Sequence, residues 1–183
     1  MTARRSAVLG LIFCLAAGLL SASRRRDPLT DTEVDQLREA AQAPDVRLRL
    51  YVKFTRARMV VIEQLRGDPK LAENRGKRIH DLLEDLSLLE GELNDNMSNY
   101  AGYDVRKALK EIVELDAELQ LKLRSLKEAS DDAAVKESGD YRFALQDTIE
   151  SVNDNADSAR EMLDEQNKLA KEKKLKKSEP LVK

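Results

Sequence analysis

The chain has 183 residues, of which 42% are hydrophobic, 36% are charged and 4% are aromatic, with a formal net charge of −2. One Cys and one His exclude a disulfide scaffold and a zinc ribbon. The chain lacks the several long apolar spans of a polytopic membrane protein and has too many aliphatic residues to be wholly disordered. A small, charge-rich, helical protein remains.

Residues 1–23 have the layout of a secretory signal peptide. Arg4 and Arg5 precede an uncharged apolar run over residues 7–20, and three small residues follow that run. We therefore predict cleavage after the third small residue, and export to the periplasm or the medium. The three arginines that come next leave an uncleaved N-terminal anchor open as the alternative, because positive charge there opposes export. Cleavage would remove Cys14, the one cysteine.

The rest of the chain divides into three parts. We predict a basic linker over residues 24–29, a helical bundle domain over residues 30–170 and a Lys-rich flexible tail over residues 171–183. The length is that of one domain with its own core.

The first two predicted helices are set by caps and prolines. Thr30 and Glu33 form a capping box that starts a short helix, which ends before Pro44. A second helix begins at Pro44 and stops at Gly67, with one apolar stripe: Leu48, Val52, Thr55, Met59, Ile62 and Leu65. Residues 46–54 also alternate with the period of a strand, but the 3-4 spacing continues beyond them and favours a helix.

Three longer predicted helices follow. They run from about Asp68 to Ser98, from a cap at Asp104 to about Ala129, and from Tyr141 to about Leu169. Apolar residues recur in the first at Ile79, Leu82, Leu86, Leu89 and Leu93, and in the second at Val105, Leu109, Ile112, Leu115, Leu119, Leu123 and Leu126. Four long amphipathic helices joined by short turns predict an all-α, up-down antiparallel bundle with a short N-terminal helix.

Charge is segregated between the helices. Residues 44–66 carry six basic and two acidic side chains, whereas residues 140–166 carry eight acidic and two basic ones. Opposite charges favour adjacent helices, so we predict that the second helix lies beside the fifth. Two solvated faces that never meet are the alternative, because surface ion pairs contribute little.

An apolar-Asn-Asp-Asn pattern occurs twice, 59 residues apart, and places Asn96 and Asn155 on predicted core positions. The third and fifth helices run parallel in an up-down bundle, so the two residues could form polar layers at matching heights. We interpret them as a polar core layer that sets helix register. An ion or small-ligand site inside the bundle is the alternative.

No catalytic, cofactor-binding or metal-binding residues are predicted. His80 shares a helix face with Glu84, but a di-iron bundle needs two Glu-x-x-His motifs. A nucleophile elbow and a phosphate-binding loop are also missing from the sequence. We therefore expect a protein without enzymatic activity.

A candidate basic surface comprises Arg47, Arg49, Lys53, Arg56, Lys171, Lys173, Lys174, Lys176 and Lys177. It could contact an anionic membrane or polymer weakly, although a Lys-rich helix end also serves solubility and the helix dipole. Nucleic acid is not an expected partner. We predict an exported, non-enzymatic bundle that acts through helix–helix contacts with an unknown protein partner or as a homo-oligomer. A holdase-like chaperone or membrane-surface protein is the alternative, and a metal- or small-ligand-binding bundle is the third.

Overall fold

The computed structural model describes residues 27–130 and 138–172, and this part of the chain contains helices and no strand. The elements are α1 (Asp31–Glu39), α2 (Pro44–Gly67), the 3-10 helix η1 (Pro69–Leu71), α3 (Arg75–Asn99), α4 (Arg106–Ser130) and α5 (Ser138–Lys171). Among the described helices, none is long and apolar enough to cross a membrane. The predicted signal peptide lies outside the described residues, as do all but the last three residues of the predicted linker and all but the first two of the predicted tail.

Helices α1 and α2 follow the predicted caps. The Thr30 hydroxyl accepts a hydrogen bond from the backbone N–H of Glu33 (3.3 Å), and the Glu33 carboxylate accepts one from the backbone N–H of Thr30 (2.8 Å). Pro44 occupies the first turn of α2, where a missing N–H costs nothing. Residues 46–54 are helical, which excludes the strand interpretation.

Helix α3 starts later than predicted. Asp68 caps the short η1 helix instead, accepting a hydrogen bond from the backbone N–H of Lys70 (2.9 Å). Asn74 then adopts a left-handed conformation with φ of 52°, which interrupts any continuous helix. The regular helix therefore begins only at Arg75.

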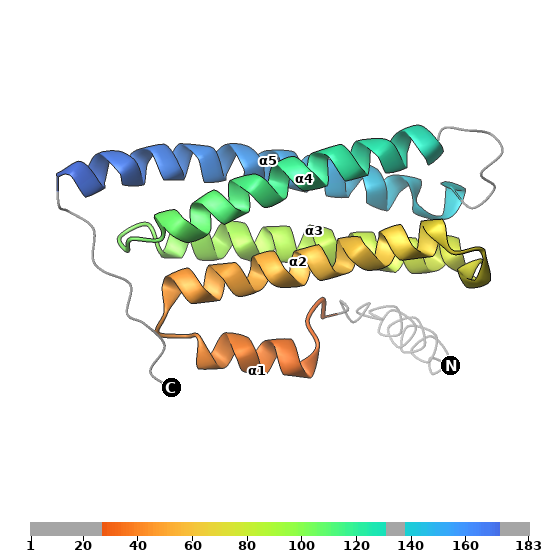
Figure 1. The fold of residues 1–183 in the computed structure, drawn as a ribbon, viewed down its shortest axis with the longest axis horizontal. Helices are drawn as coiled ribbons and strands as arrows, with labels where there is room; N and C mark the ends of the chain where they lie inside the picture. Colours follow the sequence, from red (N-terminus) through yellow and green to blue (C-terminus); the bar gives the residue numbers. More distant parts are fainter. Residues whose placement is uncertain (1–26, 131–137, 173–183) are drawn as a thin grey trace, which may run out of the picture.

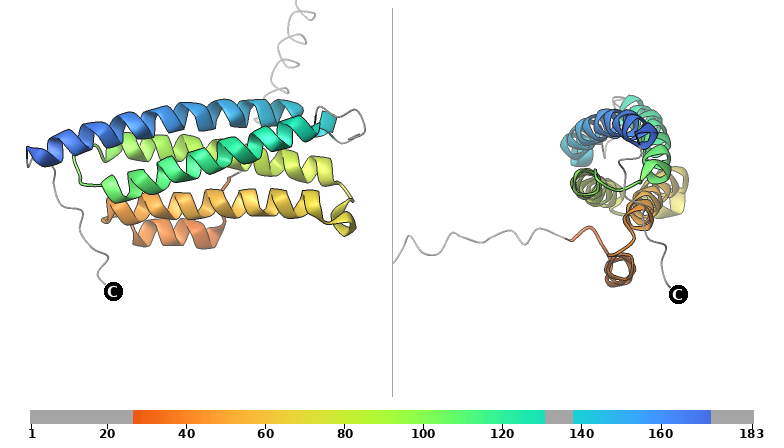
Figure 2. Two further views of the ribbon diagram at one scale, coloured as in Figure 1. Left: turned by 45° about the horizontal axis from the view of Figure 1, so that its top comes forward. Right: turned by 90° about the vertical axis from the view of Figure 1, so that its left-hand side faces the viewer.

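The four long helices form an up-down bundle whose end-on view is shown in Figure 2. Helix α2 packs against α3 and α4, and α5 packs against the same two helices, so α2 and α5 are diagonal. The order around the bundle is therefore α2, α3, α5, α4. Helices α3 and α5 run parallel, because contacts such as Ser87 to Ser151 and Thr148 to Leu83 keep a constant separation of 64 or 65 residues.

The prediction that the second helix lies beside the fifth is wrong. The cations of α2 meet other partners: Arg58 binds Glu33 of α1, and Arg56 lies 3.3 Å from Glu118 of α4. Because these ion pairs neutralise cations of α2 on α1 and α4, the positive charge of α2 does not require α5 as its neighbour.

The core is one aliphatic seam along the bundle axis. Its fully buried side chains include Leu48, Ile62, Leu83, Leu86, Leu89, Leu93, Leu109, Ile112, Leu119, Leu123 and Val152. On α3 the prediction of Leu82 as a seam residue is wrong, since Leu82 is half-buried and Leu83 takes the core position. The seam of α3 therefore steps from Ile79 to Leu83, Leu86 and onwards.

Helix α1 lies outside the bundle, along α2 (Figure 1). Its buried apolar contribution is small and centres on Leu37. Polar contacts from α2 hold it as well: Arg58 donates to Glu33 and to the backbone oxygen of Pro28, and Arg47 donates to the backbone oxygen of Leu37.

Helix α5 projects beyond the other helices at its C-terminal end (Figure 1). Just before this projection, Gln166 is buried against the α3–α4 connection. Its side-chain oxygen accepts a hydrogen bond from the backbone N–H of Val105 (3.1 Å), and its nitrogen donates to the backbone oxygen of Tyr103 (2.8 Å). One α5 side chain thus fixes the turn between α3 and α4.

Candidate functional site

Three polar side chains meet in the core of the bundle, one each from α3, α4 and α5. Glu90 is 1% exposed, Asp116 is 0% exposed and Asn155 is 2% exposed. The Asn155 amide nitrogen donates to Glu90 Oε2 at 2.5 Å. We call these three residues the buried polar cluster.

Burial controls the acid–base state of this cluster. Burial first, and then the nearby negative charge of Asp116, raise the pKa of Glu90 to about 8, against a lowering effect of the Asn155 hydrogen bond. Burial also raises the pKa of Asp116 to about 7, while Asn155 and the positive charge of Arg160 act in the opposite direction. The two carboxyl groups therefore resist being ionised together at neutral pH.

The two acids were missed from the sequence because charged residues were assigned to solvent. The 3-4 spacing of the apolar residues on α3 and α4 would have identified both acids. Glu90 falls in the 3-4 series of α3 between Leu86 and Leu93, and Asp116 falls in the series of α4 between Ile112 and Leu119. A carboxylate that replaces an aliphatic residue in an otherwise regular seam is the signal.

Asn96 and Asn155 are both buried, but at different heights. The α3–α5 register pairs Asn155 with Glu90, which is 65 residues away rather than 59. The expectation of matching heights is therefore wrong by six residues, or about 9 Å at the rise of an α-helix. Asn96 contacts α2 instead, accepting from Arg47 Nε at 3.1 Å and donating to the backbone oxygen of Glu92 at 2.7 Å.

The basic residues of α2 face partners within the molecule. Arg47 binds Asn96, Arg49 lies 3.0 Å from Asp45, and Lys53 lies 3.4 Å from Gln36 of α1. Arg56 pairs with Glu118, as described above. From the predicted tail, Lys171 is exposed at the end of α5, whereas Lys173, Lys174, Lys176 and Lys177 lie outside the described residues. Within the described part of the chain, the four predicted cations of α2 therefore each have a partner, and their joint surface with the tail stays a prediction.

A different charged surface runs along α5. Seven exposed carboxylates share one face of this helix at 3-4 spacing or multiples of it: Asp140, Asp147, Glu150, Asp154, Asp157, Glu161 and Asp164. The position between the first two belongs to Phe143, which is 82% exposed. We call these seven carboxylates and Phe143 the acidic stripe.

Little within the described part of the chain neutralises the acidic stripe. Asp157 pairs with Arg160 on the same helix (3.0 Å), and Glu150 accepts a hydrogen bond from Gln146 (2.8 Å). The basic helix α2 lies diagonally across the bundle and cannot reach it. The stripe spans about 36 Å at the rise of an α-helix and presents its charge to solvent.

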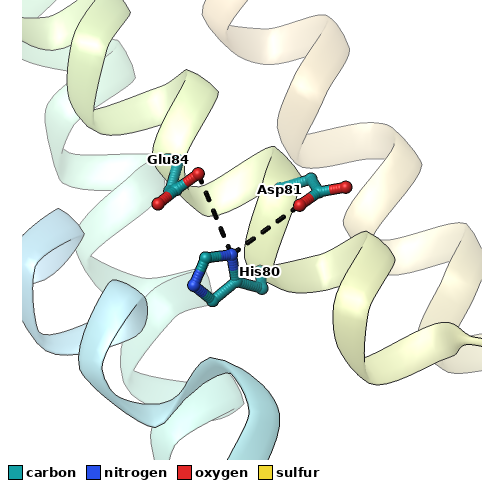
Figure 3. Close-up of side chains that lie close together, drawn as sticks. All are labelled: His80, Asp81 and Glu84. Carbon is teal, nitrogen blue, oxygen red and sulfur yellow. Dashed lines mark ion pairs between the residues drawn. The ribbon is translucent and has the colours of Figure 1, made fainter. Parts of the chain in front are cut away.

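His80, Asp81 and Glu84 form a third polar group, on the surface of α3 (Figure 3). His80 Nδ1 lies 3.7 Å from an Asp81 oxygen and 3.9 Å from a Glu84 oxygen. Lys77 Nζ already lies 2.8 Å from Asp81 and supplies a positive charge there. All these side chains are partly exposed and come from one helix, which makes the group an ordinary solvated face.

No protein family model, curated protein or solved structure matches this chain. Function is therefore argued from the surfaces and clusters described above.

Proposed function

We propose that this protein is a non-enzymatic binding protein that recognises a basic, helical partner through the acidic stripe of α5. One observation carries the proposal: seven exposed carboxylates stand on a single face of a rigid helix, and the basic helix of the same molecule lies diagonally away from them. In this proposal the chain is exported by residues 1–23 and meets its partner outside the cytoplasm.

The spacing of the stripe favours a helical partner. Lys and Arg side chains at 3-4 spacing on a second helix would face the carboxylates of α5 one for one. Charge complementarity of this kind accelerates association and selects the partner. Phe143, at one end of the stripe, offers an aromatic anchor of the type that dominates binding energy at interfaces.

Self-association through this surface is disfavoured. Two copies of the stripe would bring carboxylates against carboxylates whether the helices ran parallel or antiparallel, and like charges in contact are unfavourable. An anionic membrane would be repelled for the same reason. A basic protein segment is therefore the partner that fits.

The test uses a fluorescent helical peptide with Lys at 3-4 spacing and one Leu at its end, and a scrambled peptide of the same composition. Binding to the patterned peptide should be tighter than to the scrambled one and should weaken about tenfold or more between 50 and 300 mM NaCl. The variant D147K/D154K/E161K should lose this binding, and F143A should weaken it.

A matched control places the same charge change elsewhere. The variant E73K/E114K/E128K alters three exposed acidic residues outside α5 and should bind within about twofold of the wild-type chain, because it leaves the interface contacts intact. If both triple variants weaken binding equally, binding depends only on the net charge of the protein, and the proposal that the acidic stripe is the binding surface is wrong.

A further inference from the structure

Four oxygen atoms of the buried polar cluster have no hydrogen-bond partner in the described part of the chain. They are Glu90 Oε1, both carboxylate oxygens of Asp116, and Asn155 Oδ1. Their side chains are at most 2% exposed, so bulk water does not satisfy them. Buried polar atoms are almost always paired, and a group of unpaired acceptors therefore calls for an explanation.

The cluster is built from three different helices rather than from neighbouring residues on a surface. Asn155 is aimed into the acidic pair, because its amide nitrogen donates to Glu90 Oε2. Asp116 is close enough to Glu90 for the two negative charges to oppose each other. A deeply buried amide thus joins two carboxyl groups, and neither of them forms an ion pair within the described part of the chain, although the charge of Arg160 acts on Asp116 from a distance.

The chemistry of the donors is uniform. Two carboxylates and one amide oxygen are hard ligands, and the cluster contains neither imidazole nor thiolate. Such ligands suit Ca²⁺, Mg²⁺ or Mn²⁺, and a charge of +2 balances two carboxylates. We infer that Glu90, Asp116 and Asn155 form an internal binding site for one divalent cation that prefers oxygen ligands.

A fourth oxygen lies at the same level of the bundle. Thr55 is fully buried in α2, and its hydroxyl has no partner among the described residues. The contacts of Arg56 with Glu118 and of Asp45 with Ala108 show the register of α2 and α4, in which Thr55 lies near the level of Asp116. All four long helices could therefore supply an oxygen at this level, and a bound cation would link them.

The experiment uses the full chain, stripped of metal with EDTA and dialysed, and measures the melting temperature and the ion stoichiometry with Ca²⁺, Mg²⁺ and Mn²⁺ separately. At least one ion should bind one per chain and raise the melting temperature by about 5–10 °C at 100 times its Kd. Glu90→Gln and Asp116→Asn should each lose this response. Both remove a charge with almost no change in shape, and circular dichroism checks that each variant is folded.

Asp81→Asn and Glu84→Gln are the matched controls, because they change the surface group around His80 in the same chemical way. They should keep the full response. The inference is overturned if none of the three ions binds stoichiometrically, if Glu90→Gln and Asp116→Asn respond like the wild-type chain, or if the controls abolish the response. These outcomes are independent of peptide binding by the acidic stripe.

Discussion

Two acidic residues occupy seam positions and oppose stability at the scale of single residues. Glu90 and Asp116 each occupy a place where the 3-4 pattern would otherwise put an aliphatic side chain. Burial opposes their ionisation, and Asn155 supplies Glu90 with a hydrogen bond. Buried charged groups stabilise a fold only when they are fully paired, so this cluster lowers stability in the metal-free chain.

This cost can be measured by comparing two variants in EDTA. Asn155→Leu removes the donor to Glu90 and should lower the free energy of unfolding by about 1–3 kcal/mol. Adding Glu90→Met replaces the acid that has lost its hydrogen-bond donor by an apolar side chain of similar shape. This second change should raise the free energy of unfolding again by about 1–4 kcal/mol. Urea denaturation gives both values. If the double variant is less stable than Asn155→Leu alone, Glu90 is not a destabilising, unpaired acid in the metal-free chain.

At the scale of elements, α1 is held differently from the four long helices. Its buried apolar contact centres on Leu37, and its ion pair joins Glu33 to Arg58, which also binds the backbone oxygen of Pro28. The hydrogen bond from Arg58 holds the pKa of Glu33 below its usual 4.5, against the opposing effect of burial. Helix α1 therefore depends on polar contacts with α2 for much of its attachment, and the ion pair of Glu33 is the one among them whose acid has a shifted pKa.

The attachment of α1 should consequently be weakened in acid. A carboxylate whose pKa is lowered in the folded state stabilises that state above pH 4.5, and the contribution disappears as the pH falls through the lowered value. Methyl NMR signals of Leu37 should shift towards solvent-exposed values in this range while those of Leu86 do not. In Glu33→Gln the signals should already be shifted at pH 7. Unchanged Leu37 signals down to pH 2 would contradict this dependence.

At the scale of the whole molecule, the order of the helices decides which surfaces are free. Because α2 and α5 are diagonal, the cations of α2 pair with α1 and α4, and the carboxylates of α5 face solvent. The same order brings α3, α4 and α5 together around the buried polar cluster. The proposed binding surface on α5 and the proposed internal cation site are both consequences of this one arrangement.

An engineered disulfide tests the arrangement directly. Ser87 and Ser151 place their side-chain oxygens 2.8 Å apart across α3 and α5. In a Cys14→Ser background, Ser87→Cys with Ser151→Cys should form an intramolecular disulfide, because the side-chain atoms at these two positions already approach one another. The control Glu92→Cys with Ser151→Cys has the 59-residue separation of the repeated Asn pattern and should keep both thiols free. Thiol titration distinguishes the two, and the opposite result would contradict the parallel register.

The sequence by itself determined the local structure. The capping box at Thr30, the proline at the start of α2 and the 3-4 aliphatic spacing predicted helices, because each of these signals acts within a few residues of the chain. The bundle class followed from four amphipathic stripes that had to be buried. The burial of Asn96 and Asn155 was likewise visible in the spacing of their own helices.

Only the tertiary structure decided which stripes meet and at what height. Periodicity is a property of one helix and carries no information about its neighbour, and exposed charge blocks are too weakly coupled in water to choose one. The 65-residue register of α3 and α5 depends on how their side chains interdigitate along the whole seam. For this reason the meeting of Glu90, Asp116 and Asn155, from three separate helices, appears only in the folded chain.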